Sequence, residues 1–136
     1  MAVVPLVNDE EASVEALAVF NEIRQVRGTD YVNNFWRALA HDPVQLKSVW
    51  NNIQSVMAPG ALDPLVKELI YVAVSTANGC GYCVHSHTAS ARTKGMTPAM
   101  HAELLAVIAM ASQTNALATA LGVPVDARFD PEQTKG

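Results

Sequence analysis

At three places between residues 42 and 98 of this 136-residue chain, a residue that can cap a helix is followed directly by proline. The pairs are Asp42-Pro43, Asp63-Pro64 and Thr97-Pro98. Asp and Thr side chains accept hydrogen bonds from the first free backbone amides of a helix, and proline is favoured at the first helical position. Apolar residues then recur at spacings of three and four, and no segment alternates as a strand does. The sequence therefore predicts an all-α chain.

These and similar signals predict about six helices in a single domain covering residues 1–136, with a core of about 9–122. Asp9 is expected to cap the first helix, which would stop at Gly28, and Asp30 a short second helix through Leu39. The other helices are expected at about 43–57, 64–77, 80–94 and 98–121. The polar tail 123–136 is expected to be extended or loosely ordered.

The composition predicts an oligomer and excludes some partners. Half of the residues are hydrophobic and only 16% are charged, against about 25% charged in an average soluble domain. Because so few charges cannot cover the surface of a small domain, we expect a homo-oligomer.

The net charge of −4 and the nine scattered Lys and Arg residues argue against binding of nucleic acid. The apolar run Leu104 to Ala111 is far shorter than the roughly 20 residues that span a bilayer, so no membrane partner is expected.

The N-terminal residues lack a basic region and run into Asp9-Glu10-Glu11, which is unlike a secretory signal. A cytoplasmic location is therefore expected. In that reducing compartment, two cysteines spaced Cys-x-x-Cys indicate redox or metal chemistry more than a structural disulfide.

Glu68 lies inside the most apolar of the expected helices, 64–77. Its neighbours three and four positions away are Pro64, Leu65, Tyr71 and Val72, and none of them is cationic. A carboxylate without a counter-charge in apolar surroundings is costly to ionise, so we expect the pKa of Glu68 to be raised towards neutrality, as a proton relay needs. The alternative is that a partner from another helix or subunit neutralises Glu68, or that Glu68 faces solvent.

Twelve residues after Glu68 comes the segment Cys80-Gly-Tyr-Cys-Val-His-Ser-His87. In a helix, Cys80 and Cys83 lie about one turn apart, within reach of a disulfide after modest adjustment. Cys83 and His87 share one face. A helix N-terminus also stabilises a thiolate. One stripe would therefore hold two thiols and an imidazole, a set suited to thiol redox chemistry.

Two other interpretations of these residues remain open. Cys80, Cys83 and His87 could hold zinc with Glu68 or a water as the fourth ligand, although no second cysteine pair completes a structural site. Alternatively, the cysteines are simply small buried residues.

Two neighbouring side chains are accessory candidates. Tyr82, between the thiols, is placed to pack or to donate a hydrogen bond. His85 points roughly away from His87 and is expected at the surface. Trp36, Trp50 and Met110 lie on apolar helical spacings and are expected in the core or a subunit interface.

Together the candidate positions form the pattern E-x11-C-x-x-C-x3-H, from Glu68 to His87. This pattern resembles the alkylhydroperoxidase D-like branch of the carboxymuconolactone decarboxylase family, and the resemblance spans roughly residues 15 to 125. Further segments that fit this family's small members are Phe35-Trp-Arg-Ala-Leu39, Met57-Ala-Pro-Gly-Ala-Leu-Asp-Pro64, Lys67-Glu-Leu69 and Ala89-Ser-Ala-Arg-Thr-Lys-Gly95.

The resemblance implies an alkylhydroperoxidase D-like helical fold, assembled as trimers or hexamers, and thiol-dependent reduction of peroxides. Cys83 would be the thiolate that attacks the peroxide, and Cys80 the resolving thiol that closes the disulfide. Glu68 and His87 would form a proton relay through a water. The residues themselves favour Cys83 because His87 shares its face, but they leave the order of the thiols open, since in many Cys-x-x-Cys sites the first thiol is the nucleophile.

The resemblance also bears on cofactors and on alternative functions. It implies no bound cofactor or metal, and an external dithiol reductant such as a lipoyl group or a thioredoxin-like protein. The best-studied peroxidases of this branch have a histidine where this chain has Tyr82, and they contain the helical unit twice. The chain is closer in length to the lactone decarboxylases, which lack the cysteine pair. The alternatives are therefore a carboxymuconolactone decarboxylase-type lyase, or a non-catalytic redox or metal-binding oligomer.

Overall fold

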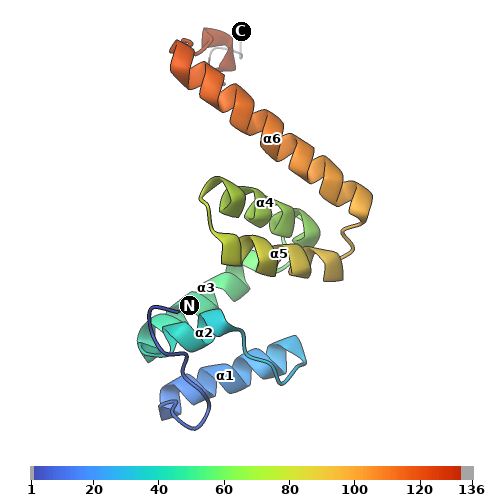
Figure 1. Cartoon of the computed structure of the whole chain (residues 1–136). Coiled ribbons are helices and arrows are strands. Elements are labelled where there is room, and N and C mark those ends of the chain that lie inside the picture. Colours follow the sequence, from blue (N-terminus) through green and yellow to red (C-terminus); the bar gives the residue numbers. More distant parts are fainter. Residues whose placement is uncertain (1, 133–136) are drawn as a thin grey trace. The chain divides into compact units, whose positions relative to one another are not determined.

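The computed structural model describes residues 2–132, and this part of the chain contains six α-helices, one short 3-10 helix and no strand (Figure 1). The prediction of an all-α fold with about six helices is confirmed. The chain divides into two compact units, Met1–Ala58 and Pro59–Gly136. That residues 1–136 form a single domain stays a prediction.

The first unit contains α1 (Val14–Arg27), α2 (Asn34–Leu39) and α3 (Pro43–Met57). Its core forms around two tryptophans, Trp36 and Trp50, whose rings meet edge to face at 5.4 Å between centroids. Phe20, Ile23 and Leu46 are fully buried in the same cluster. The apolar spacing of the sequence thus correctly predicts both tryptophans as core residues.

The predicted starts of α1 and α2 are wrong. Ser13 caps α1, because its Oγ accepts a hydrogen bond from the Ala16 N–H at 3.1 Å. The Asp9 carboxylate instead pairs with Arg24 at 2.8 Å and Arg37 at 3.2 Å. Asp9 therefore binds two guanidinium groups instead of the helix end. Local sequence patterns do not predict such pairs, because the partners are distant in sequence.

The N-cap position of α2 is Asn33, not the predicted Asp30. The backbone carbonyl of Asp30 accepts a hydrogen bond from the Arg24 Nε at 2.8 Å. Residues 31–33 are therefore part of the connection between α1 and α2.

The second unit contains α4 (Pro64–Ala77), α5 (Gly81–Thr93) and α6 (Pro98–Leu121), and α4 packs along α5 (Figure 1).

Each predicted cap-proline pair starts a helix. The Asp42 carboxylate accepts from the Gln45 N–H at the start of α3, Asp63 from Leu65 at α4, and Thr97 from Met100 at α6. Four of the six helix starts thus follow the sequence signals closely.

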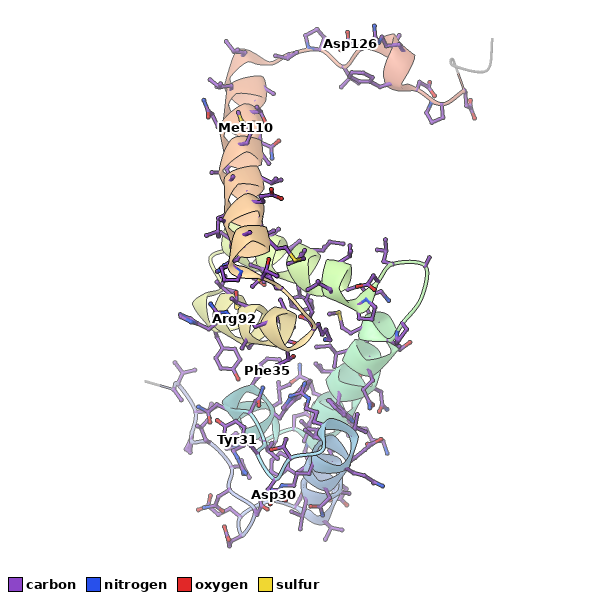
Figure 2. All side chains as sticks on the ribbon, turned by 90° about the vertical axis from the view of Figure 1, so that its right-hand side faces the viewer. Asp30, Tyr31, Phe35, Arg92, Met110 and Asp126 are labelled. Atoms are coloured by element: carbon purple, nitrogen blue, oxygen red, sulfur yellow. A yellow bond between two sulfur atoms is a disulfide. The ribbon has the colours of Figure 1, made fainter. Side chains whose placement is uncertain are left out.

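The apolar helix α6 has no buried residue in the described structure. Met110, labelled in Figure 2, is 52% exposed. By length and composition alone, α6 is apolar enough to cross a membrane, so the expectation of no membrane partner stays a prediction. Further exposed apolar side chains of α6 are Leu105, Val107, Leu117 and Leu121.

The tail after α6 contains one 3-10 turn, Ala127–Phe129, within a segment otherwise without regular structure. The prediction of an extended or loosely ordered tail holds for 123–126, and its last residues, 133–136, lie outside the described residues.

Candidate active site

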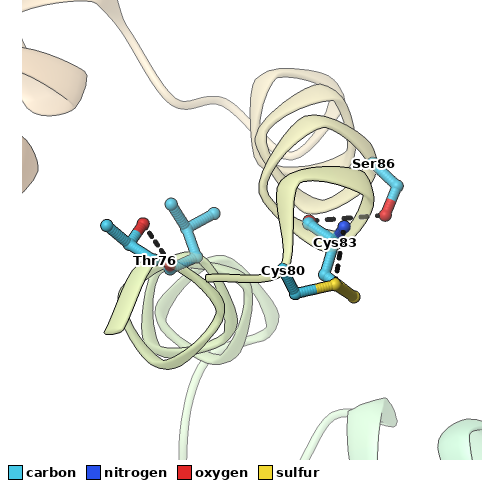
Figure 3. The surroundings of a disulfide bond; sticks show 5 residues. Thr76, Cys80, Cys83 and Ser86 are labelled. Atoms are coloured by element: carbon cyan, nitrogen blue, oxygen red, sulfur yellow. Dashed lines mark hydrogen bonds between the residues drawn. A yellow bond between two sulfur atoms is a disulfide. The ribbon is translucent and has the colours of Figure 1, made fainter. Parts of the chain in front are cut away.

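A disulfide joins Cys80 and Cys83 at the N-terminus of α5 (Figure 3). Cys80 is the N-cap residue, and its Sγ accepts a hydrogen bond from the Cys83 backbone N–H at 3.2 Å. Gly79, with φ of 72°, makes the left-handed turn between α4 and α5. The spacing argument for a bridge between the two thiols is therefore confirmed, with a Cα–Cα distance of 5.3 Å.

Glu68 on α4 and His87 on α5 face each other between the two helices. The Glu68 Oε2 and the His87 Nδ1 are 2.7 Å apart, and Glu68 is 3% exposed. Because an ionised carboxylate only accepts hydrogen bonds, we assign the proton of this bond to Nδ1. The Nε2 atom of a neutral imidazole is then the nitrogen that can take a proton.

Two further residues of α5 bind the other oxygen of the same carboxylate. The Ser90 Oγ donates to Oε1 at 2.9 Å, and the Lys94 Nζ at 2.5 Å. Lys94 also donates to the Ser90 Oγ at 3.2 Å. His87, Ser90 and Lys94 therefore follow one stripe of α5, at spacings of three and four, that faces Glu68. Ser90 and Lys94 are not among the predicted site residues, although their spacing of three and four residues after His87 is a signal that could have identified them.

These contacts reverse the expectation for the pKa of Glu68. Burial raises this pKa, but the hydrogen bonds from His87, Lys94 and Ser90, with the positive charge of Lys94, outweigh burial and lower it to about 2. The prediction of a raised pKa is wrong because it considered only neighbours on the same helix. The alternative, a neutralising partner on another helix, is the one observed.

Tyr71 covers one face of the imidazole. Its ring is stacked on His87 with centroids 3.6 Å apart and planes 18° apart. Tyr71 lies three residues after Glu68 on α4, so one stripe of α4 supplies both the hydrogen bond and the stacking contact. The imidazole is thereby fixed in position and orientation.

The remaining candidate residues lie around this centre. Cys83 precedes His87 by one turn of α5, so the two share a helical face as expected. The side chains of Tyr82 and His85 are exposed, and neither appears in the hydrogen-bond network of Glu68 among the described residues. No cluster of three or more His, Cys, Asp or Glu side chains in the described chain has an arrangement that would hold a metal ion, so the zinc arrangement of Cys80, Cys83 and His87 is not formed in this disulfide state.

Three comparisons with known proteins show what this chain is similar to. Residues 45–126 match the family model described as the carboxymuconolactone decarboxylase family. A protein named alkyl hydroperoxide reductase AhpD from Solibacter usitatus is 42% identical over 71 residues, which are 52% of this chain and 38% of that protein. One of the same name from Maricaulis maris is 36% identical over 67 residues, 49% of this chain and 37% of that protein. The match thus spans little more than a third of these relatives' length.

A solved structure matches much more of the chain. The crystal structure of the alkylhydroperoxidase AhpD core from Rhodospirillum rubrum is 60% identical, with a TM-score of 0.91, and the match covers 95% of this chain and 97% of that one. The residues from Glu68 to His87 all lie within the range matched by the family model, which covers more than half of the chain. The chain therefore belongs to the carboxymuconolactone decarboxylase family, in its alkylhydroperoxidase D-like branch.

Proposed function

We propose that this protein is a thiol-dependent peroxidase that uses Cys80 and Cys83 in a dithiol–disulfide cycle. The observation that carries the proposal is a disulfide at the N-terminus of α5, one turn before a histidine held by a buried carboxylate. The two curated relatives and the solved structure, all named as alkyl hydroperoxide reductase or alkylhydroperoxidase, support it.

In the first step, the Cys83 thiol gives its proton to the Nε2 of His87, directly or through a water. The thiolate attacks one peroxide oxygen, the O–O bond breaks, and the leaving oxygen takes a proton from His87 and departs as an alcohol or water. Cys83 is left as a sulfenic acid. The thiolate is the reactive form of the thiol, and an adjacent base that creates it is the usual means of activation.

In the second step, the Cys80 thiol loses its proton and its sulfur attacks the sulfur of Cys83. The sulfenic hydroxyl takes up that proton and leaves as water, which gives the disulfide seen in the structure. The Cys83 backbone N–H lies 3.2 Å from the Cys80 Sγ, and this donor at the helix N-terminus stabilises negative charge on Cys80. In sum, two thiols and one peroxide become one disulfide, one alcohol and one water.

The cycle needs partners that supply electrons. We propose an external dithiol reductant such as a lipoyl group or a thioredoxin-like protein, with no bound cofactor or metal. We also propose a cytoplasmic location, where a disulfide of this kind is transient and catalytic. We further propose assembly into a homo-oligomer, a trimer or hexamer, which the exposed apolar side chains of α6 support. We propose no nucleic-acid or membrane partner.

The deciding experiment is the consumption of hydrogen peroxide and of an organic hydroperoxide, with dithiothreitol or dihydrolipoamide as reductant. We expect turnover by the native sequence well above the reductant blank, and none by Cys83→Ser. A native protein that does not exceed the blank with either peroxide would refute the proposal.

The family model's description supports a second candidate, lactone decarboxylation. An assay with carboxymuconolactone separates the two activities, since a lyase needs neither thiol. Lactone turnover that survives in the Cys80→Ser/Cys83→Ser double variant would favour the lyase.

A further inference from the structure

We propose that Lys94 is a positioning residue that holds Glu68 as a permanent anion, so that His87, and not Glu68, receives the proton of Cys83. This inference rests on the peroxidase function proposed above. It changes the task of the carboxylate. Glu68 would orient His87 and stabilise its protonated form without itself gaining or losing a proton.

The hydrogen bonds of Glu68 stabilise its ionised form. Oε2 accepts from His87, and Oε1 accepts from both Ser90 and Lys94. Donors thus occupy three of the roughly four lone-pair sites of the carboxylate. Protonation of Glu68 would remove the negative charge that strengthens all three hydrogen bonds, so these bonds oppose a part for Glu68 in proton transfer.

Lys94 is the member of the network that supplies a positive charge independent of the catalytic cycle. Its Nζ binds both the Glu68 Oε1 and the Ser90 Oγ, so the three polar groups form a closed triangle. The Glu68 side chain is 4% exposed and that of Lys94 is 35% exposed. The carboxylate is thus in a low-dielectric position, where a charged hydrogen bond is strongest, while the ammonium group keeps part of its hydration.

The position of Lys94 on α5 also suits a cation. Lys94 is the C-cap residue of this helix, where the unpaired carbonyl groups create a partial negative charge. The low pKa of Glu68, about 2 despite burial, agrees with a carboxylate that stays ionised at any pH at which the protein works.

Both α4 and α5 carry other charged or titratable groups, and Lys94 is the cation that lowers the pKa of Glu68 through its charge. Tyr71 of α4 stacks on His87, and Cys83 lies one turn before it on α5. The remaining groups are Lys67 on α4 and Tyr82, His85 and Arg92 on α5. The helix α6, which contacts α4, carries His101 and Glu103. Within the described structure, neither His101 nor Glu103 forms a hydrogen bond or an ion pair with Glu68 or His87. Removal of the Lys94 charge should therefore change the pKa of Glu68.

The experiment compares three substitutions of Lys94. Lys94→Arg keeps the charge, Lys94→Gln keeps a donor without charge, and Lys94→Met keeps neither. In each full-length variant, the side-chain carboxyl of Glu68 is followed by carbon-13 NMR between pH 2 and 8. Circular dichroism confirms that the helices are retained, which is expected because Lys94 lies at the end of α5.

We expect the native Glu68 signal to be constant above about pH 4, and to remain so in Lys94→Arg. In Lys94→Gln and Lys94→Met, the titration should move upward by about one to two pH units, because loss of a nearby opposite charge typically has effects of this size. A native carboxyl that titrates between pH 5 and 8 would overturn the inference. An unchanged titration in the Gln and Met variants would overturn it too.

The rate of Cys83 oxidation by peroxide gives a second readout. The ratio of the native rate to the Lys94→Met rate should rise about twofold or more as the pH falls from 7 to 3, since a protonated Glu68 no longer orients His87. A merely structural role of Lys94 predicts one constant ratio at all pH values, and that result would count against the proposal. If the native protein oxidises no thiol with peroxide, only the proposed function fails, because the carboxyl titration judges Lys94 without any turnover.

Discussion

The Oε2 of Glu68 on α4 lies 2.7 Å from the Nδ1 of His87 on α5. This hydrogen bond fixes the imidazole with Nδ1 as donor and leaves Nε2 as the basic nitrogen. Cys83, one turn before His87 on the same helix, completes an order of thiol, imidazole and carboxylate. The same logic of nucleophile, base and orienting acid recurs on unrelated folds. In this chain, two neighbouring helices of one unit provide all three groups.

Replacing the carboxylate tests this order. Glu68→Gln should keep the fold and lower the rate of Cys83 oxidation by about 10²-fold, because an amide can offer His87 a donor as easily as an acceptor and stabilises an imidazolium poorly. Stopped-flow measurement of thiol oxidation between pH 5 and 9 gives the rate. His87→Gln should behave similarly, and the double variant should be little worse than either single one. Full activity of Glu68→Gln would show that the carboxylate is only a packing partner.

The sequence predicts the features that depend on neighbouring residues, namely most helix starts and the disulfide. It does not predict the ion pairs that depend on residues far apart in the chain. The cap-proline pairs located the starts of α3, α4 and α6, and the Cys-x-x-Cys spacing located the disulfide. The charge state of Glu68 was misjudged because its cation, Lys94, is 26 residues away in sequence. Asp9 was misassigned for the same reason, since Arg24 and Arg37 bind it from 15 and 28 residues away. Local periodicity contains no information on such contacts.

The products of the Cys80→Ser and Cys83→Ser variants should distinguish the roles of the two thiols. Cys83→Ser should abolish peroxide turnover, whereas Cys80→Ser should permit one attack and then stop at a sulfenic acid or a mixed disulfide on Cys83. Mass spectrometry after a single turnover distinguishes these states, with dimedone to trap the sulfenic acid. If Cys80→Ser loses the first attack and Cys83→Ser keeps it, the two roles are exchanged.

The stacking of Tyr71 on His87 predicts a graded effect. Tyr71→Leu removes an aromatic contact worth about 0.5–1.5 kcal/mol and should lower the oxidation rate by about two- to tenfold, because the imidazole gains freedom to rotate. Tyr71→Phe keeps the ring and should stay near the native rate. The same stopped-flow assay measures both. Equal losses in both variants would assign the effect to the hydroxyl group instead of the ring.

The exposed apolar side chains of α6 predict an interface between copies of the chain. Multi-angle light scattering at micromolar concentration should give the mass of a trimer or a multiple of it. Leu117→Lys, at a position 53% exposed, should lower this mass, because an interface core excludes unpaired charge. Val44→Lys, at a position 80% exposed in the first unit, is the matched control and should not. A monomeric mass for the native chain would contradict the prediction.

The low pKa of Glu68 predicts a defined loss of stability in acid. Burial raises this pKa, but the bonds from His87, Lys94 and Ser90 lower it from 4.5 to about 2, so folding favours the ionised form. The contribution of Glu68 to the free energy of unfolding is therefore fully present above about pH 4.5 and is lost as the pH falls through that value towards 2. Its upper limit is roughly 3 kcal/mol, reduced by the partial hydration of Lys94.

Urea unfolding between pH 2 and 6, at one protein concentration, measures this loss. The native chain should lose more stability over this range than Glu68→Gln, in which the titrating group is absent. Asp9→Asn is the matched control, because the pKa of Asp9 is also lowered, chiefly by the hydrogen bond from Arg24, yet this carboxylate lies in the other unit. Asp9→Asn should therefore retain the steep acid dependence that comes from Glu68. Parallel curves for the native chain and Glu68→Gln from pH 6 to 2 would show that folding does not favour the ionised form of Glu68. The hydrogen bonds from His87, Ser90 and Lys94 would then give no net stabilisation of the Glu68 carboxylate.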